Sequence, residues 1–240
     1  MGLRPAASAV YAPRVVRLVL FDVDGTLIHT GGAGVKAFAR TLASQFGQPD
    51  GTEGIKFGGR TDPSLVREAF GKCDIPASPE NFDRFFGAYV FWLDHLLANN
   101  ASGGACAGVW RFLDDLRALP QPPALGLLTG NIRLGAEIKL RRYGLWETFD
   151  TGAFGDDHED RNQIATIAKA RGGRLLGTEL NGDQIVVVGD TPRDIECGRA
   201  IGARVLAVAT GGATSEYLRA HRPDWVVEDL QRVSAAEVCR

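Results

Sequence analysis

The sequence DVDGT at residues 22–26 decides how this chain folds and where its chemistry lies. The apolar run before it, residues 15–21, is too short for an ordinary helix and predicts a strand buried on both faces of a parallel sheet. A single aspartate after such a strand is usually a turn former. Asp22 and Asp24 together can instead provide a nucleophile and a proton donor, with oxygens left for a hard cation.

Composition places the chain among ordinary globular proteins. It has 240 residues, of which 45% are hydrophobic and 23% are charged, enough for one domain with an insertion or two small domains. The net charge of -2 gives no electrostatic reason to bind nucleic acid or an anionic membrane, so we expect neither as a partner. Its longest apolar stretches have the length of strands, so none is expected to span a bilayer.

The amino terminus and the cysteines bear on location. Residues 1–13 lack the apolar core of a secretory signal, and we expect a flexible tail there. The four cysteines, Cys73, Cys106, Cys197 and Cys239, form no Cys-x-x-Cys pair and show no zinc-ligand spacing. Isolated thiols are typical of a reducing compartment, so we expect a cytoplasmic protein.

Strands and helices alternate over most of the chain. Further strands are predicted at residues 124–128, 185–188, 204–209 and 225–227. Helices are predicted at residues 109–119, 132–143, 162–171, 193–201 and 214–221. This alternation predicts an α/β fold, a parallel sheet covered by helices on both faces. Ligands of such sheets bind beyond the carboxyl ends of the strands, where the polar clusters of this sequence lie.

A long segment after the first strand is expected to be helical and to contain no strand. Asp62 followed by Pro63 predicts a helix start, with the aspartate as capping residue. An apolar stripe then follows one helical face, which indicates a packing seam, with a substrate pocket as the alternative. The stripe consists of Phe82, Phe85, Phe86, Tyr89, Leu93, Leu96 and Leu97. Glycine-rich stretches at residues 31–34 and 102–104 bound this insertion.

Two further strand ends carry polar residues. Thr129, Gly130 and Asn131 offer a hydroxyl and backbone amides where a helix begins, which suits an anion, although a plain helix cap has the same pattern. Asp190 and Asp194 add two carboxylates after the strand at residues 185–188. Converging carboxylates repel one another unless a cation compensates, and oxygen ligands select magnesium over zinc or copper.

These motifs together resemble those of the haloacid dehalogenase superfamily: Asp-x-Asp-Gly-Thr, then Thr-Gly-Asn, then Gly-Asp-Thr-x-x-Asp, each after a strand. The resemblance covers residues 15–27 and 109–230, and is greatest to phosphoglycolate-phosphatase-like phosphomonoesterases. It implies a Rossmann-like parallel sheet core at residues 14–30 and 105–240. It also implies an inserted small α-helical cap at residues 31–104.

The resemblance also implies a function, a magnesium-dependent phosphatase that hydrolyses a small phosphorylated metabolite. Asp22 would form an aspartyl-phosphate, and Asp24 would protonate the leaving alcohol and then activate water. Mg²⁺ would be held by Asp22, Asp190 and the backbone carbonyl of Asp24, with Asp194 in support. Thr129 would bind a phosphoryl oxygen, and Gly130 and Asn131 would contact the substrate.

One cationic position departs from the family pattern, and the role of a second one is open. A lysine normally precedes the fourth strand of such a core, whereas this chain has Arg161 there, which supplies the same charge more rigidly. Lys139, on the preceding predicted helix, is the alternative. Arg60, in a glycine-containing turn of the insertion, is predicted to contact the substrate, with an exposed loop arginine as the alternative.

Rival functions make different demands on the same residues. A 2-haloacid dehalogenase would have no use for Asp24, and a degenerate binding protein would lack one of the acids. A phosphomutase would keep both aspartates but would add a gating residue, and no histidine occurs early in the predicted cap. Residues 32–37 fit a dinucleotide fingerprint, but they do not turn directly off a strand as that fingerprint requires. Neither the substrate nor the oligomeric state follows from these motifs.

Overall fold

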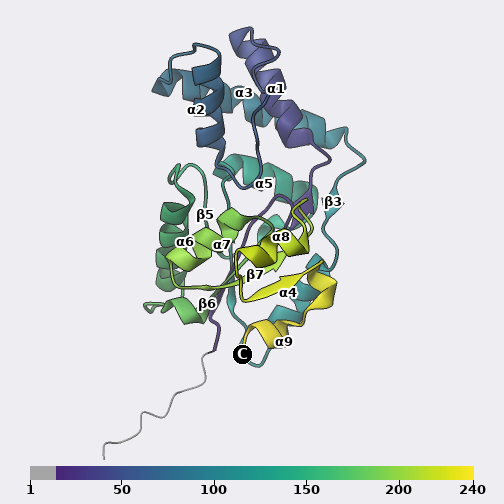
Figure 1. The fold of residues 1–240 in the computed structure, drawn as a ribbon, viewed down its shortest axis with the longest axis vertical. Helices are drawn as coiled ribbons and strands as arrows, with labels where there is room; N and C mark the ends of the chain where they lie inside the picture. Colours follow the sequence, from purple (N-terminus) through teal and green to yellow (C-terminus); the bar gives the residue numbers. More distant parts are fainter. Residues whose placement is uncertain (1–14) are drawn as a thin grey trace, which may run out of the picture.

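The computed structural model describes residues 15–240 and shows a six-stranded sheet between layers of helices (Figure 1). The predicted tail at residues 1–13 lies outside the described residues. The sheet has the order β5-β4-β1-β6-β7-β8, and every neighbouring pair is parallel, which confirms the predicted α/β fold. Its strands are β1 (Leu18–Phe21), β4 (Ala124–Leu128), β5 (Thr151–Ala153), β6 (Ile185–Gly189), β7 (Arg204–Val208) and β8 (Trp225–Val227).

The strand before the two aspartates lies in the middle of this sheet. All four residues of β1 are buried, and Leu20 pairs with Gly126 of β4 on one side and Val187 of β6 on the other. Such a position explains the uninterrupted apolar sequence, because both faces of the strand are covered. β5, which sequence periodicity does not reveal, is a three-residue edge strand held by β4.

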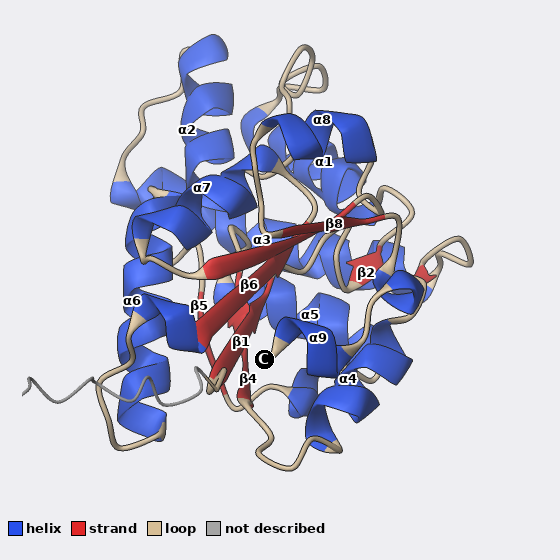
Figure 2. Cartoon of the chain, turned by 60° about the horizontal axis from the view of Figure 1, so that its bottom comes forward, coloured by secondary structure: helices blue, strands red, loops and turns tan. Residues whose placement is uncertain are grey.

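Helices cover both faces of the sheet (Figure 2). One face packs against α4 (Val109–Arg117), α5 (Arg133–Arg142) and α9 (Ala235–Val238). The other face packs against α6 (Arg161–Leu175), α7 (Pro192–Ala200) and α8 (Ser215–Ala220). Short 3₁₀ turns are η1 (Trp146–Thr148), η2 (Gly182–Gln184) and η3 (Leu230–Arg232). No helix within residues 15–240 combines the length and apolar character needed to cross a membrane.

Three further helices lie beyond the carboxyl edge of the sheet and form their own apolar cluster (Figure 1). They are α1 (Ala33–Phe46), α2 (Asp62–Lys72) and α3 (Pro79–Ala98). The predicted aromatic stripe lies on α3 and packs inward, with Phe85 fully buried and its ring centroid 4.6 Å from that of Phe38. The interpretation of the stripe as a packing seam therefore agrees with the structure.

Two expectations for this segment were wrong. The interval holds two short strands, β2 (Ile28–His29) and β3 (Gly104–Ala105), which pair antiparallel where the chain leaves and re-enters the core. Two residues each are too few for a detectable alternation. Asp62 does not cap α2 either: Thr61 occupies the cap position, and the Asp62 carboxylate instead accepts a hydrogen bond from the backbone amide of Ile132.

Candidate active site

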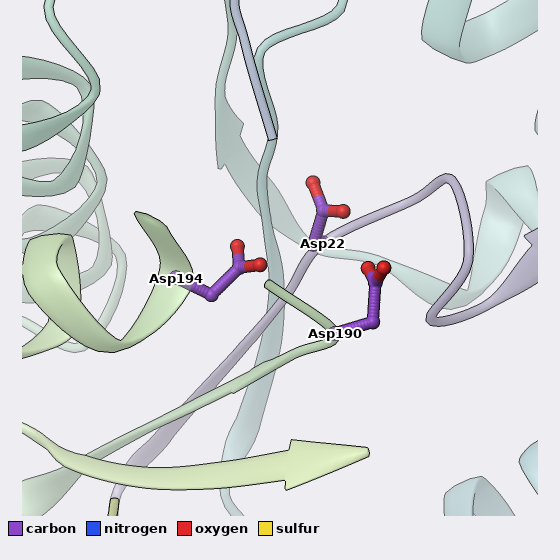
Figure 3. A group of neighbouring side chains, drawn as sticks. All are labelled: Asp22, Asp190 and Asp194. Carbon is purple, nitrogen blue, oxygen red and sulfur yellow. The ribbon is translucent and has the colours of Figure 1, made fainter. Parts of the chain in front are cut away.

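Three buried carboxylates meet at the carboxyl edge of the sheet. Figure 3 shows Asp22, Asp190 and Asp194 close together at the ends of β1 and β6 and in the first turn of α7. One oxygen of each lies within 4.8 Å of the others. The motifs, far apart in the sequence, therefore come together as their strand-end positions predict.

Two glycines make room for this cluster. Gly25 has a φ of +84°, which side chains disfavour, and a Cβ there would lie only 2.7 Å from Oδ2 of Asp190. A Cβ on Gly211 would overlap the same carboxylate. Thr26, the last residue of the DVDGT stretch, donates from Oγ1 to Oδ1 of Asp190 over 3.0 Å. The turn after β1 thus holds Asp190 from a different strand in place.

Arg161 is the cation of the cluster. Asp160 caps α6, so Arg161 is its first residue, and its side chain is buried. Its Nη2 lies 2.8 Å from Oδ1 of Asp22 and also pairs with Oδ1 of Asp194. The structure therefore places Arg161 beside the predicted nucleophile, at the position where the family lysine was expected.

Asp194 is fully engaged within the protein. Its Oδ2 accepts from the backbone amide of Thr191 over 2.9 Å and from the Thr191 hydroxyl over 2.7 Å, while Oδ1 pairs with Arg161. This capping box fixes the start of α7 and the position of the arginine. The supporting role of Asp194 in the site stays a prediction.

Burial dominates the electrostatics of the cluster. It raises the pKa of Asp22 to about 7, with Arg161 acting in the opposite direction, and it raises the pKa of Asp190 well above its ordinary value. Burial alone would lower the pKa of Arg161, but Asp194 and Asp22 hold it well above the usual value. One guanidinium cannot balance three carboxylates. An all-oxygen donor set with excess negative charge fits a hard divalent cation such as Mg²⁺.

Asp24 has a separate cation, Lys139. Nζ of Lys139 lies 2.6 Å from Oδ2 of Asp24 and also donates to Oδ1 of Asn131. Asn131 in turn donates from Nδ2 to the same Asp24 oxygen over 2.8 Å. Lys139 and Asn131 hold the Asp24 carboxylate, which is not one of the three in the cluster, and its predicted metal contact through the backbone carbonyl stays a prediction.

The buried position of Lys139 has a signal in the sequence. Ala136, Lys139, Leu140 and Tyr143 follow helical i, i+3, i+4, i+7 spacing, so a lysine stands on the apolar face of α5. A buried lysine needs a partner. The sequence suggests Lys139 only as an alternative to Arg161, whereas in the structure both cations are used: Lys139 pairs with Asp24, and Arg161 pairs with Asp22 and Asp194.

The turn before α2 reaches the core at the same edge. The backbone amide of Asp62 donates to the carbonyl of Gly130 over 2.7 Å, and Oδ2 of Asp62 accepts from Ile132 over 2.9 Å. A Cβ on Gly130 would overlap the carbonyl of Arg60, so only glycine permits this approach. Sequence reasoning missed this role of Asp62, because its partners lie about 70 residues away.

The Arg60 guanidinium is bound by residues of α2. Its guanidinium pairs with Glu68 on α2 and donates to the carbonyl of Ser64 over 3.2 Å. The structure thus does not bring this guanidinium onto the three-carboxylate cluster, and substrate binding by Arg60 stays a prediction.

A cavity of about 980 Å³ lies between α1–α3 and the carboxyl edge of the sheet. Among the predicted site residues, those that line it are Asp22, Asp24, Arg60, Thr129, Gly130, Asn131, Arg161 and Asp190, together with the alternative Lys139. Asp62 and Tyr89 from the helical segment line it as well. The site therefore lies between the core and the inserted helices.

Two known proteins are similar in sequence to this chain over most of its length. Pyrophosphatase PpaX of Oceanobacillus iheyensis is 25% identical over 224 residues, which cover 91% of this chain and 95% of that protein. Probable phosphatase IndB of Dickeya dadantii is 26% identical over 223 residues, covering 91% of this chain and 92% of that protein.

Solved structures show the same fold. CbbY from Rhodobacter sphaeroides in complex with phosphate superimposes with a TM-score of 0.72 at 18% identity, over 93% of this chain and 99% of that one. A predicted phosphoglycolate phosphatase from Haemophilus somnus gives a TM-score of 0.67 at 18% identity, over 90% and 95% of the two chains.

The family model described as haloacid dehalogenase-like hydrolase matches residues 19–208. That range runs from β1 to the end of β7 and includes every residue of the three-carboxylate cluster. The chain belongs to the haloacid dehalogenase-like hydrolase family.

Proposed function

We propose that this protein is a magnesium-dependent phosphatase that hydrolyses a small phosphorylated metabolite through an aspartyl-phosphate. The observation that carries the proposal is the division of the acid pair: Asp22 lies in the buried cluster with Arg161, and Asp24 faces the cavity with Lys139. Two carboxylates in different surroundings suit two different roles. The relatives that are named phosphatases and pyrophosphatases support the same reaction class.

In the first step an oxygen of Asp22 forms a bond to phosphorus, and the bond from phosphorus to the leaving oxygen breaks. Asp24 gives its proton to that oxygen, so the leaving group departs as an alcohol. In the second step Asp24 takes a proton from water as the water oxygen attacks phosphorus, which releases phosphate and restores Asp22. Arg161 holds Asp22 in position through their 2.8 Å contact.

Thr129 is suited to a phosphoryl oxygen. Its Oγ1 accepts from the backbone amide of Asn131 over 3.3 Å and from the Asn131 side chain over 2.8 Å. Because these contacts use the oxygen as acceptor, the hydroxyl proton is left to donate to phosphate. Gly130 and Asn131 place this turn against the cavity.

Asp22, Asp190 and the backbone carbonyl of Asp24 would hold Mg²⁺. The bound ion would neutralise charge on the transferring phosphoryl group and reduce the repulsion between that group and the carboxylates. Asp194 acts indirectly, because both its oxygens are occupied by Thr191 and Arg161.

We interpret residues 31–104 as a cap domain and residues 105–240, with the first strand, as the catalytic core. The cavity between them suits a small metabolite rather than a polymer, because the cap helices cover it. All four cysteines are free thiols, which supports a reducing, cytoplasmic location.

The alternatives fit less well. A haloacid dehalogenase has no task for Asp24, and a mutase gate would need a residue that controls Asp24. Within residues 15–240 the side-chain contacts of Asp24 are with Lys139 and Asn131, and no histidine is among them.

The purified protein should release phosphate from phosphorylated metabolites only when Mg²⁺ is present. Asp22→Asn should abolish this release. Turnover that persists in Asp22→Asn, or halide release from haloacids without metal, would contradict the proposal. Isomerisation of a sugar phosphate without net phosphate release would indicate a mutase.

A further inference from the structure

A second polar site lies beside Asp24, on the side of the cap. Tyr89 of α3 is only 2% exposed, yet it lines the cavity. Its ring packs in the aromatic seam against Phe38 and Phe85. Among residues 15–240 its hydroxyl has no hydrogen-bond partner. A tyrosine hydroxyl that faces a cavity and has no protein partner is free to hydrogen-bond a ligand bound there.

Lys139 borders the same space. Its ammonium has three donors, of which Asp24 and Asn131 use two. A Cβ on Gly34, the second residue of α1, would lie 3.7 Å from Nζ of Lys139 and 4.0 Å from Oη of Tyr89. Both donors therefore border the volume that this glycine leaves open.

The volume between Gly34, Tyr89 and Lys139 lies where the leaving group of the substrate would bind. In the proposed mechanism Asp24 protonates the leaving oxygen, and Lys139 is in direct contact with Asp24. Thr129 and Arg161, which serve the transferred phosphoryl group, contact neither Tyr89 nor Gly34 in the described residues. The part of the substrate next to the leaving oxygen thus meets Tyr89 and Lys139.

The surrounding charges favour a neutral group over an anion. Burial, and to a smaller extent the nearby Asp62 and Asp24, raise the pKa of Tyr89 well above its ordinary value, so the phenol keeps its proton. The ammonium of Lys139 already contacts Asp24 and so offers little positive charge to a second anion. A hydroxyl can accept from Tyr89 or Lys139 and donate to a carboxylate.

We propose that Tyr89 and Lys139 form a leaving-group subsite for a neutral hydroxyl next to the ester oxygen, so that the substrates are hydroxylated phosphate esters of the sugar or polyol class. This inference rests on the proposed phosphatase function. It separates such esters from phosphoglycolate and pyrophosphate, whose leaving groups carry a second anion.

The test compares kcat/KM for glycerol 3-phosphate and ribose 5-phosphate with kcat/KM for ethyl phosphate, phosphoglycolate and pyrophosphate. The wild-type protein should prefer the hydroxylated esters. Tyr89→Phe keeps the packed ring and removes only the hydroxyl, so the ratio of kcat/KM for ribose 5-phosphate to that for ethyl phosphate should fall about fivefold to tenfold. Tyr143→Phe, outside the cavity lining, is the matched control and should leave this ratio unchanged.

Gly34→Ala provides an independent variant. The added methyl group fits without a clash, at 3.7 Å from Lys139, but it occupies the proposed subsite, so the same ratio should fall. A preference of the wild type for phosphoglycolate or pyrophosphate, or an unchanged ratio in both variants, would overturn the inference while leaving the phosphatase function intact. Failure of the wild type to hydrolyse any of these phosphates with Mg²⁺ would instead contradict the proposed function.

Discussion

Nζ of Lys139 lies 2.6 Å from Oδ2 of Asp24, and the lysine side chain is only 5% exposed. The second aspartate of the DVDGT stretch therefore has a cation that is distinct from Arg161, the cation of the first. Each acid of the pair is held by a different helix, α5 for Asp24 and α6 for Asp22.

Lys139→Met should impair the proton transfer performed by Asp24. Without the ammonium, Asp24 loses its closest partner, and we expect kcat for alkyl phosphates to fall about 10²-fold, within the range of general acid catalysis. p-Nitrophenyl phosphate has a leaving group that needs little protonation, so its kcat should fall less. Steady-state kinetics on both substrates check this. Equal losses on both would show that Lys139 does not act through Asp24.

Asp22→Asn should remove the nucleophile and reduce kcat by about 10³-fold or more. The fold should persist, because the change removes one of several mutually repelling buried carboxylates. Circular dichroism and phosphate release measure the two effects. Asp83→Asn, an exposed change on α3, is the control and should keep full activity.

Arg161→Ala should both inactivate and destabilise the protein. It leaves Asp22 and Asp194 buried without their cation, and breaking a buried ion pair in this way costs about 3–5 kcal/mol. Arg161→Lys keeps the charge but loses the planar guanidinium, so stability should recover more than activity does. Urea unfolding and kcat are the measurements. Wild-type stability in Arg161→Ala would contradict the proposed ion-pair network.

Asp62→Asn should change how stability depends on pH. Burial raises the pKa of Asp62 from 3.8 to about 6, against the effect of Lys139. The native state then binds this proton more tightly than the unfolded chain, so the contribution of Asp62 to stability is lost as pH rises from about 4 to about 6. At pH 8 the variant should be more stable than the wild type, by up to about 3 kcal/mol.

The measurement for Asp62→Asn is urea unfolding at pH 4.5 and pH 8. The difference between variant and wild type at the lower pH should be only about a third of that at the higher pH. Asp83→Asn again provides a matched exposed control. A difference that is the same at both pH values would show that Asp62 is not held with a raised pKa.

Removal of divalent metal should abolish activity, and Mg²⁺ should restore it. Asp190→Asn should raise the Mg²⁺ concentration needed for half-maximal rate, because the three-carboxylate cluster loses one charge. Titration of activity with Mg²⁺ measures this shift. Full activity after exhaustive chelation would contradict a metal-dependent mechanism.

Much of the site follows from local sequence. Asp22, Thr129 and Asp190 each stand directly after a strand, and parallel strands bring their carboxyl ends to one edge whatever lies between them. The family resemblance implied a cation at the place of Arg161, with Lys139 as the alternative, and Arg161 contacts Asp22. The buried aromatic face of α3 could also be predicted, because its apolar residues recur with the period of a helix.

Other features depended on contacts that periodicity does not report. β2 and β3 are two residues each and form only because the chain passes the same place twice. Asp62 has the sequence context of a helix cap, yet its carboxylate binds the amide of Ile132 on a distant segment. Arg60 lies in the expected turn, but its guanidinium pairs with Glu68 on α2, the helix that follows directly.

The sequence by itself therefore determined the family, the parallel sheet and the acid pair at Asp22 and Asp24, because these depend on short motifs attached to strand ends. Only the tertiary structure decided how the pair is divided, with Arg161 on Asp22 and Lys139 on Asp24. The physical reason is that a buried charge takes whichever opposite charge folding brings within contact distance. That choice is set by how α5, α6 and the sheet pack together, and no local pattern encodes it.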